Sequence, residues 1–187
     1  MIYMKKTWII IGIVAVVIVA GLFSYYNKFV TAGEQIDGQW AQVEAQYQRR
    51  FDLIPNLVES VKGVMAQEKD VFGMIADART KYVGAGTVNE KAAAATEVES
   101  ALSRLLVVME NYPQLKSADT VQTLMAQLEG SENRISVERG RFNEEVRGYN
   151  VMVKRFPGNM LAGMFGFGER NYFEATNGSE NAPAVKF

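Results

Sequence analysis

The chain has 187 residues, enough for one domain and a membrane anchor, and carries 20 basic against 21 acidic side chains. This balance creates no net field that would attract nucleic acid. The sequence contains neither cysteine nor histidine, which excludes disulfides, thiolate metal sites, cysteine nucleophiles and the commonest general base. We therefore expect no enzyme activity, no cofactor, no bound metal and no nucleic-acid partner.

The first predicted element is an apolar helix over residues 7–26, which carries no charged side chain. About 20 helical residues span roughly 30 Å, the thickness of the hydrocarbon core of a bilayer. Trp8, Tyr25 and Tyr26 stand at its two ends, where aromatic side chains favour the membrane interface. The pattern predicts a single transmembrane helix. The alternative is a cleaved signal peptide, although its apolar region would be long and no A-x-A pattern follows.

Basic residues predict the orientation of this helix. Lys5 and Lys6 precede the apolar segment, whereas Lys28 alone follows it closely. The positive-inside rule then places residues 1–6 in the cytoplasm as a short N-terminus. The rest of the chain would lie outside the inner membrane.

Apolar residues recur every three or four positions along residues 27–156, which is typical of amphipathic helices. Asp52 followed by Pro55 predicts that a helix begins there, and Pro113 predicts that another ends. The predicted helices span residues 27–51, 54–83, 89–112 and 118–156. Four helices with short connections favour an antiparallel up-and-down four-helix bundle, with a coiled-coil-like seam along the last helix. The predicted fold is all-α, a transmembrane helix that continues into this bundle.

The last predicted helix is longer than its neighbours. It would extend roughly 55 Å, whereas the predicted helix over residues 27–51 would extend roughly 38 Å. Either it bends near Gly140 or Gly148, or its end reaches the membrane surface.

An apolar, membrane-proximal segment over residues 157–173 follows the last helix. The candidate membrane-interface residues are Phe156, Met160, Leu161, Met164, Phe165 and Phe167. Such residues can lie in the lipid interface, but they can equally form a short helix that covers the open end of the bundle core. Residues 174–187 are polar and rich in Gly and Asn, which predicts a flexible tail.

Two polar clusters are candidate interaction or structural sites. The first comprises Arg49, Arg50, Asp52 and Asn56, which the predicted turn would place at the end of the bundle far from the bilayer. As a binding site this cluster would take an anion or the acidic helix of a partner. As a structural element it would be a capped corner held by salt bridges.

The second cluster interrupts the apolar seam of the last helix at Glu132, Asn133 and Arg134. Counting from the predicted turn, a buried Arg134 would pair with Asp37 or Glu68 and fix the register of the bundle. The alternative is an enzyme that uses carboxylates such as those of Glu68 and Glu132.

Several motifs resemble the signature of the LemA family. The most specific is the run RRFDLIPNLV at residues 49–58, and others are Trp40, Tyr112-Pro113, residues 128–135, Tyr149-Asn150 and Phe156-Pro157. The resemblance implies a bacterial membrane protein with one anchor and a four-helix bundle. It implies no established reaction. Where the family usually has a tyrosine before Asn143, this chain has Phe142.

These observations favour a non-enzymatic, membrane-anchored scaffold or adaptor that self-associates and organises or remodels the membrane. Its predicted partners are membrane lipid, further copies of the chain and another membrane protein. The alternative function is an accessory or regulatory subunit of a membrane protease or sensor kinase. The family resemblance implies membrane metalloprotease genes as neighbours.

Overall fold

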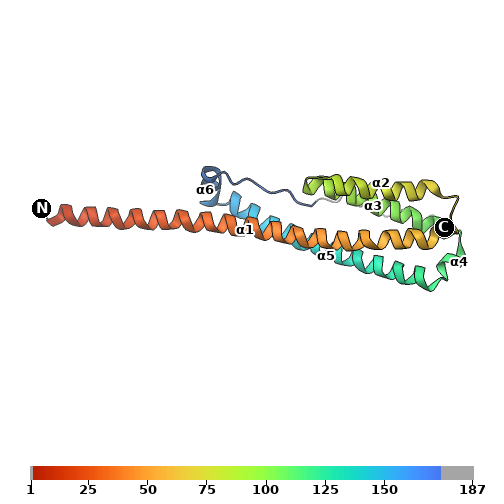
Figure 1. Ribbon diagram of the computed structural model, residues 1–187. Coiled ribbons are helices and arrows are strands. Elements are labelled where there is room, and N and C mark those ends of the chain that lie inside the picture. The colour runs from red at the N-terminus through yellow and green to blue at the C-terminus, as the bar shows by residue number, and fades with distance from the viewer. Residues whose placement is uncertain (1, 174–187) are drawn as a thin grey trace, which may run out of the picture. The chain divides into compact units, whose positions relative to one another are not determined.

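The computed structural model describes residues 2–173 of the chain, and within this range all regular structure is α-helical (Figure 1). The helices are α1 (Ile2–Lys62), α2 (Lys69–Gly84), α3 (Val88–Met109), α4 (Pro113–Lys116), α5 (Asp119–Lys154) and α6 (Gly158–Phe165). The all-α prediction is confirmed for the described residues. The predicted tail over residues 174–187 lies outside them.

The helices contribute to two compact units. Unit 1 combines the start of the chain, up to Trp40, with Phe142–Arg170. Unit 2 combines Ala41–Arg141 with the described residues after Arg170, which are residues 171–173. α1 and α5 are continuous helices that belong to both units, whereas α2, α3 and α4 belong to unit 2 and α6 to unit 1.

α1 is one helix where the sequence predicts two. The predicted helix end at residue 51 is wrong, because Pro55 lies inside α1, which ends at Lys62. A proline in a helix interior removes one backbone hydrogen bond and costs about 3 kcal/mol. Burial of apolar side chains on both sides of the proline compensates for this loss. These buried residues are Val43, Tyr47, Phe51, Ile54, Leu57 and Val61.

The later end of α1 moves the other boundaries of the predicted helices. Residues 63–68 form the connection to α2, so only the second half of the predicted helix over residues 54–83 corresponds to α2. The predicted helices over residues 89–112 and 118–156 correspond to α3 and α5.

The length of α1 also removes the mismatch that the sequence predicts between the first and last helices. Beyond Tyr26, α1 continues for about 36 residues, and α5 has 36 residues. Each of these stretches therefore extends about 54 Å at 1.5 Å per residue. α5 needs no bend at Gly140 or Gly148 to match α1, and it is assigned as one helix from Asp119 to Lys154.

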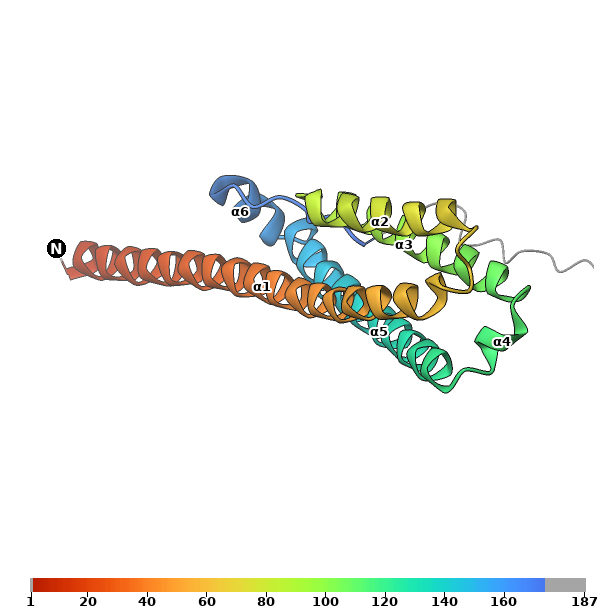
Figure 2. The same ribbon diagram turned by 45° about the vertical axis from the view of Figure 1, so that its right-hand side comes forward.

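In unit 2, α2 and α3 lie side by side in both views (Figures 1 and 2). A capping box begins α3: the Thr87 hydroxyl accepts from the backbone N–H of Glu90, and the Glu90 carboxylate accepts from that of Thr87. The backbone N–H groups of Gly86 and Thr87 lower the pKa of Glu90, because they stabilise its charged form. The ring of Tyr82 on α2 lies 4.6 Å from that of Phe51 on α1, so aromatic contacts join α1 to the α2–α3 pair.

In unit 1, α1 and α5 run antiparallel. Phe29 contacts Tyr149 with ring centroids 6.4 Å apart, and Trp40 contacts Phe142 at 5.2 Å. The later residue on α1 therefore meets the earlier residue on α5. Phe142, where the family pattern has a tyrosine, is buried against Trp40, so its ring acts here in packing.

The start of α1 is the one helix stretch among the described residues that is long and apolar enough to cross a membrane. Its most apolar window is not buried inside the structure at all. Large side chains such as Trp8, Val16 and Val17 are each more than half exposed.

The continuity of α1 predicts the effect of Pro55→Ala. If Pro55 lies inside the helix, alanine restores a backbone donor and raises the free energy of unfolding by about 1–3 kcal/mol. Thermal or denaturant unfolding in detergent, followed by circular dichroism, measures this change. Pro113→Ala is the matched control, because Pro113 occupies the first turn of α4, where proline is tolerated. A neutral or destabilising effect of Pro55→Ala would restore the predicted helix boundary.

Candidate functional site

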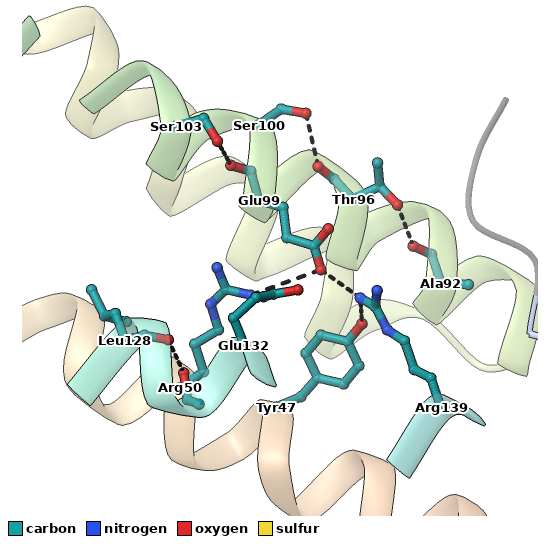
Figure 3. A network of polar contacts seen from close by, with 11 residues as sticks. Tyr47, Arg50, Ala92, Thr96, Glu99, Ser100, Ser103, Leu128, Glu132 and Arg139 are labelled. Atoms are coloured by element: carbon teal, nitrogen blue, oxygen red, sulfur yellow. Dashed lines mark hydrogen bonds and ion pairs between the residues drawn. The ribbon is translucent and has the colours of Figure 1, made fainter. Parts of the chain in front are cut away.

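Five side chains of unit 2 form a connected polar cluster, which we call the polar layer (Figure 3). Tyr47 and Arg50 come from α1, Glu99 from α3, and Glu132 and Arg139 from α5. Arg50 pairs with Glu132 and lies 3.8 Å from Glu99. Arg139 donates to Glu99 and to the hydroxyl of Tyr47. The layer therefore joins three helices through two arginines and two glutamates.

The polar layer lies within apolar packing. Arg50 is 8% exposed and stands between Tyr47 and Ile54 on the buried stripe of α1. On α5 the layer fills the gap of the apolar seam between Leu128 and Ile135. Ser131, also buried in this gap, donates its hydroxyl to the carbonyl of Leu128 at 2.7 Å. Charged groups in such a setting are stable only when they are paired, as they are here.

The surroundings hold two titratable side chains of the polar layer, Tyr47 and Arg139, each in one protonation state. Burial raises the pKa of Tyr47 above its ordinary value, outweighing the opposing effect of Arg139. Burial alone would lower the pKa of Arg139, but Tyr47 and Glu99 raise it. The phenol therefore stays neutral and the guanidinium stays charged around neutral pH. Groups held in this way are suited to fixing structure rather than to transferring protons.

The layer leaves two buried donors without an acceptor. The Nε atoms of Arg50 and Arg139 lack a hydrogen-bond partner. Each unpaired buried donor reduces stability. The arrangement thus contributes directional pairing between helices, which specifies their register, more than it contributes net stability.

The first predicted cluster is divided by the structure. Arg50 is buried in the polar layer, whereas Arg49, Asp52 and Asn56 are exposed on the outer side of α1. Asp52 accepts from the side chain of Gln48 at 2.8 Å, one turn earlier. The predicted corner capped by Asp52 is wrong, because α1 continues and has no end at this position.

The second predicted cluster is divided in the same way. Glu132 pairs with Arg50, but Asn133 and Arg134 are exposed, so the predicted buried pair of Arg134 with Asp37 or Glu68 is wrong. The carboxylate of Glu68 accepts from the hydroxyl of Tyr112 at 3.4 Å. Glu68 and Glu132 thus have different contacts. The other predicted partner, Asp37, lies 3.6 Å from Arg170 in unit 1.

Sequence reasoning missed three members of the layer, and one of them carried a signal. Arg139 lies four residues after Ile135 and three before Phe142, so it occupies a seam position of α5. A charged residue at such a position predicts a buried partner. Tyr47 has the spacing of an ordinary member of the apolar stripe of α1. Glu99 lies next to the apolar stripe of α3. Neither residue is therefore distinguished by its spacing.

A groove of about 680 Å³ lies next to the polar layer in unit 2. Its apolar lining comes from α1, α3 and α5 and includes Leu57, Leu102, Leu106, Met109, Val121 and Met125. Glu110, Glu129 and Glu132 add carboxylates to this lining, and the one basic side chain is Arg50. A volume of this size accommodates a small ligand or the side chains of a docked helix.

The candidate membrane-interface residues divide into two sets in unit 1. Phe165 and Phe167 contact the rings of Tyr26 and Phe29 on α1. Leu161 is partly buried, and Phe156, Met160 and Met164 are exposed by 79%, 66% and 60%. Phe156 precedes α6, so its four-residue spacing from Met160 is not a helical one.

Asn150 is a further residue whose role the sequence did not reveal. It is buried on α5, and its side-chain amide exchanges two hydrogen bonds of 2.8 Å with the backbone of Arg170. These bonds hold the chain after α6 against α5. Gly158 lies so close to the carbonyl of Met152 that no Cβ atom would fit there, and both ends of α6 are therefore held to α5.

No group of three or more acidic side chains among residues 2–173 could hold a metal ion. The hydrogen bonds and ion pairs of the polar layer all join residues of unit 2.

Comparison with known proteins identifies related sequences. A sequence model described as LemA family matches residues 39–187. Magnetosome proteins MamQ 1 and MamQ 2 of Paramagnetospirillum magneticum are each 30% identical over 192 residues, covering 88% of this chain and 71% of each relative. Magnetosome protein MamQ of Magnetospirillum gryphiswaldense is 29% identical over 184 residues, covering 84% of this chain and 68% of the relative. The residues that the LemA sequence model matches include the whole polar layer.

The pairing in the polar layer predicts the effect of Arg50→Met. The substitution leaves Glu132 and Glu99 without their shared cation, and we expect a loss of about 2–3 kcal/mol in the free energy of unfolding. The loss is moderate because Glu132 keeps access to water. Denaturant unfolding in detergent measures it. Arg147→Met, which breaks an exposed pair with Glu144, is the control and should change stability little.

A double variant tests whether the two residues act together. Arg50→Met with Glu132→Leu replaces the pair by apolar groups and should recover part of the loss. Strictly additive losses would contradict the pairing.

Proposed function

We propose that this chain, which belongs to the LemA family, is a non-enzymatic membrane-anchored scaffold that associates with further copies of itself through unit 2. The observation that carries the proposal is that α5 takes part in two unlike surfaces, an apolar groove with carboxylates and an outer face with the exposed Arg134 beside Val137. Surfaces of opposite charge on one molecule can join copies in a head-to-tail manner.

The proposed anchor is the start of α1, over residues 7–26. This stretch is apolar and exposed along its length, which suits a lipid surrounding. With Lys5 and Lys6 before it, we place the N-terminus in the cytoplasm and the two units on the outer side of the inner membrane. We further propose that the helices of unit 2 form an antiparallel up-and-down bundle, supported by the contacts of α1 with α3 and α5 in the polar layer.

The groove is the first of the two surfaces. Its apolar lining includes Leu106 and Met125, of which Leu106 is 36% exposed. Glu110 and Glu129 in its lining are exposed to solvent. An apolar surface edged by carboxylates favours a partner helix that carries apolar and basic side chains together.

The outer face of α5 offers such a combination. Arg134 and Val137 lie three residues apart and are both exposed, Val137 by 52%. Arg141 follows one turn later, but it pairs with Glu138 at 2.8 Å, so Arg134 is the cation on which the proposed contact rests. Arg134 stands two positions after Glu132, which turns it to nearly the opposite side of the helix. The outer face with Arg134 and the groove can therefore contact different neighbours at the same time.

Anchoring favours this association. Molecules held in one membrane meet in two dimensions, which raises their effective concentration without any new contact. A head-to-tail contact that does not close into a ring produces an extended array, and an array of anchored copies organises the membrane beneath it. The related MamQ sequences are named as magnetosome proteins, which supports a role at a membrane.

Charge reversal tests the proposed contact. Arg134→Glu and Glu129→Lys should each weaken association about tenfold, because like charges then face each other. Combining both substitutions in one chain should restore association. The measurement is energy transfer between donor- and acceptor-labelled full-length chains in phosphatidylcholine vesicles at fixed surface density.

Arg104→Glu is the matched control, since it changes the charge equally at an exposed position of α3 outside the groove. No recovery in the combined variant, or no energy transfer between wild-type chains at high density, would contradict the proposal. Wild-type chains that stay single but co-purify with a membrane protease or sensor kinase would support the accessory-subunit function instead.

A further inference from the structure

α6 has an inner and an outer face that differ in their contacts. The helix, GNMLAGMF, contains no charged residue. Its inner face includes Ala162, which is 1% exposed, and Phe165, whose ring lies 5.3 Å from that of Tyr26. Its outer face includes Met160 and Met164, one helical turn apart and both largely exposed.

The inner contacts place α6 beside the end of the apolar stretch of α1. Tyr26 is the last residue of that stretch, and it contacts Phe165 and Phe167. Phe167 also stacks on Phe29 at 5.0 Å, less than one turn further along α1. Within unit 1, α6 therefore lies at the level where the apolar stretch of α1 ends (Figures 1 and 2).

Several contacts fix α6 in this place. Asn150 holds the backbone of Arg170, and Lys154 pairs with Glu169 at 2.8 Å. Gly166 ends the helix in the left-handed conformation, at φ 77°, which glycine adopts without strain. The outer face is thus presented by an anchored helix, not by a loose chain end.

We propose that the outer face of α6 lies in the lipid interface, as a second membrane contact beside the transmembrane helix. This inference rests on the proposed membrane span of residues 7–26. A helix with exposed methionines and no charge inserts shallowly between the headgroups and the start of the acyl chains. The exposed Arg155, immediately before the turn into α6, matches the negative surface of a membrane that contains anionic lipid.

Contact with lipid explains the exposed outer face of α6 better than a role as a cover for the bundle core does. A helix that only covers the core buries its apolar side chains, as α6 does with Ala162. Met160 and Met164 remain exposed after all the contacts of the inner face are made, and Phe156 adds a 79% exposed ring in the turn before α6. Two contacts with the bilayer would restrain the tilt of α1, which a single helix leaves free.

The absence of cysteine allows single labels on the full-length chain. Met160→Cys and Met164→Cys report on α6, Val17→Cys reports on the proposed span, and Val83→Cys is the control, an exposed apolar position of α2. Each variant carries an environment-sensitive fluorophore and is reconstituted into vesicles of phosphatidylcholine and phosphatidylglycerol. Nitroxide groups attached at shallow or deep acyl positions quench only labels at their own depth.

We expect blue-shifted emission and quenching by shallow nitroxides at Met160 and Met164, quenching by deep nitroxides at Val17, and emission typical of water at Val83. Labels on α6 that behave like the one at Val83, with Val17 still quenched, would overturn the inference and make α6 a cover for the core. An unquenched label at Val17 would instead overturn the proposed span.

Discussion

The ion pair between Arg50 and Glu132 is the interaction on which the arrangement of unit 2 depends. It joins α1 to α5, and Glu99 connects it to α3 and to Arg139. Apolar side chains can slide past one another by a helical turn with little loss of stability. A buried arginine cannot leave its carboxylates without a larger loss of stability. The polar layer therefore fixes which residues of α1 and α5 face each other, and with them the groove and the outer face of α5.

The apolar periodicity was sufficient to predict helices in nearly all of the chain, yet it misplaced one boundary. Pro55 after Asp52 has the pattern of a helix start, and only the burial of Leu57 and Val61 reveals that the helix continues. This wrong boundary also displaced the predicted partner on α1. Glu132 lies about 13 residues after the start of α5, so its partner should lie about as far before the end of α1. Counting back from Lys62, the observed end, reaches Arg50, whereas counting back from residue 51, the predicted end, reaches Asp37. The register was thus predictable in principle, once the end of α1 was known.

The site could be predicted only in part, for the same physical reason. A gap in an apolar seam predicts a polar layer at Glu132, but the partner depends on contacts between distant parts of the chain. The apolar segment after Phe156 illustrates the same limit. Its composition left lipid contact and core cover open, whereas in the structure Phe165 and Phe167 pack on α1, and Met160 and Met164 remain exposed. Spacing alone could not separate two roles within one short helix.

The most direct test of this account measures which residues of unit 2 are neighbours. In a chain without cysteine, the pair Leu57→Cys and Leu128→Cys, which line the same groove on α1 and α5 and leave the ion pair intact, can be joined by a short thiol crosslinker. The pair Glu68→Cys and Arg134→Cys serves as the comparison. We expect rapid intramolecular crosslinking of positions 57 and 128 in the membrane-reconstituted protein and none between 68 and 134. Crosslinking of the second pair in preference to the first would contradict the register set by Arg50 and Glu132.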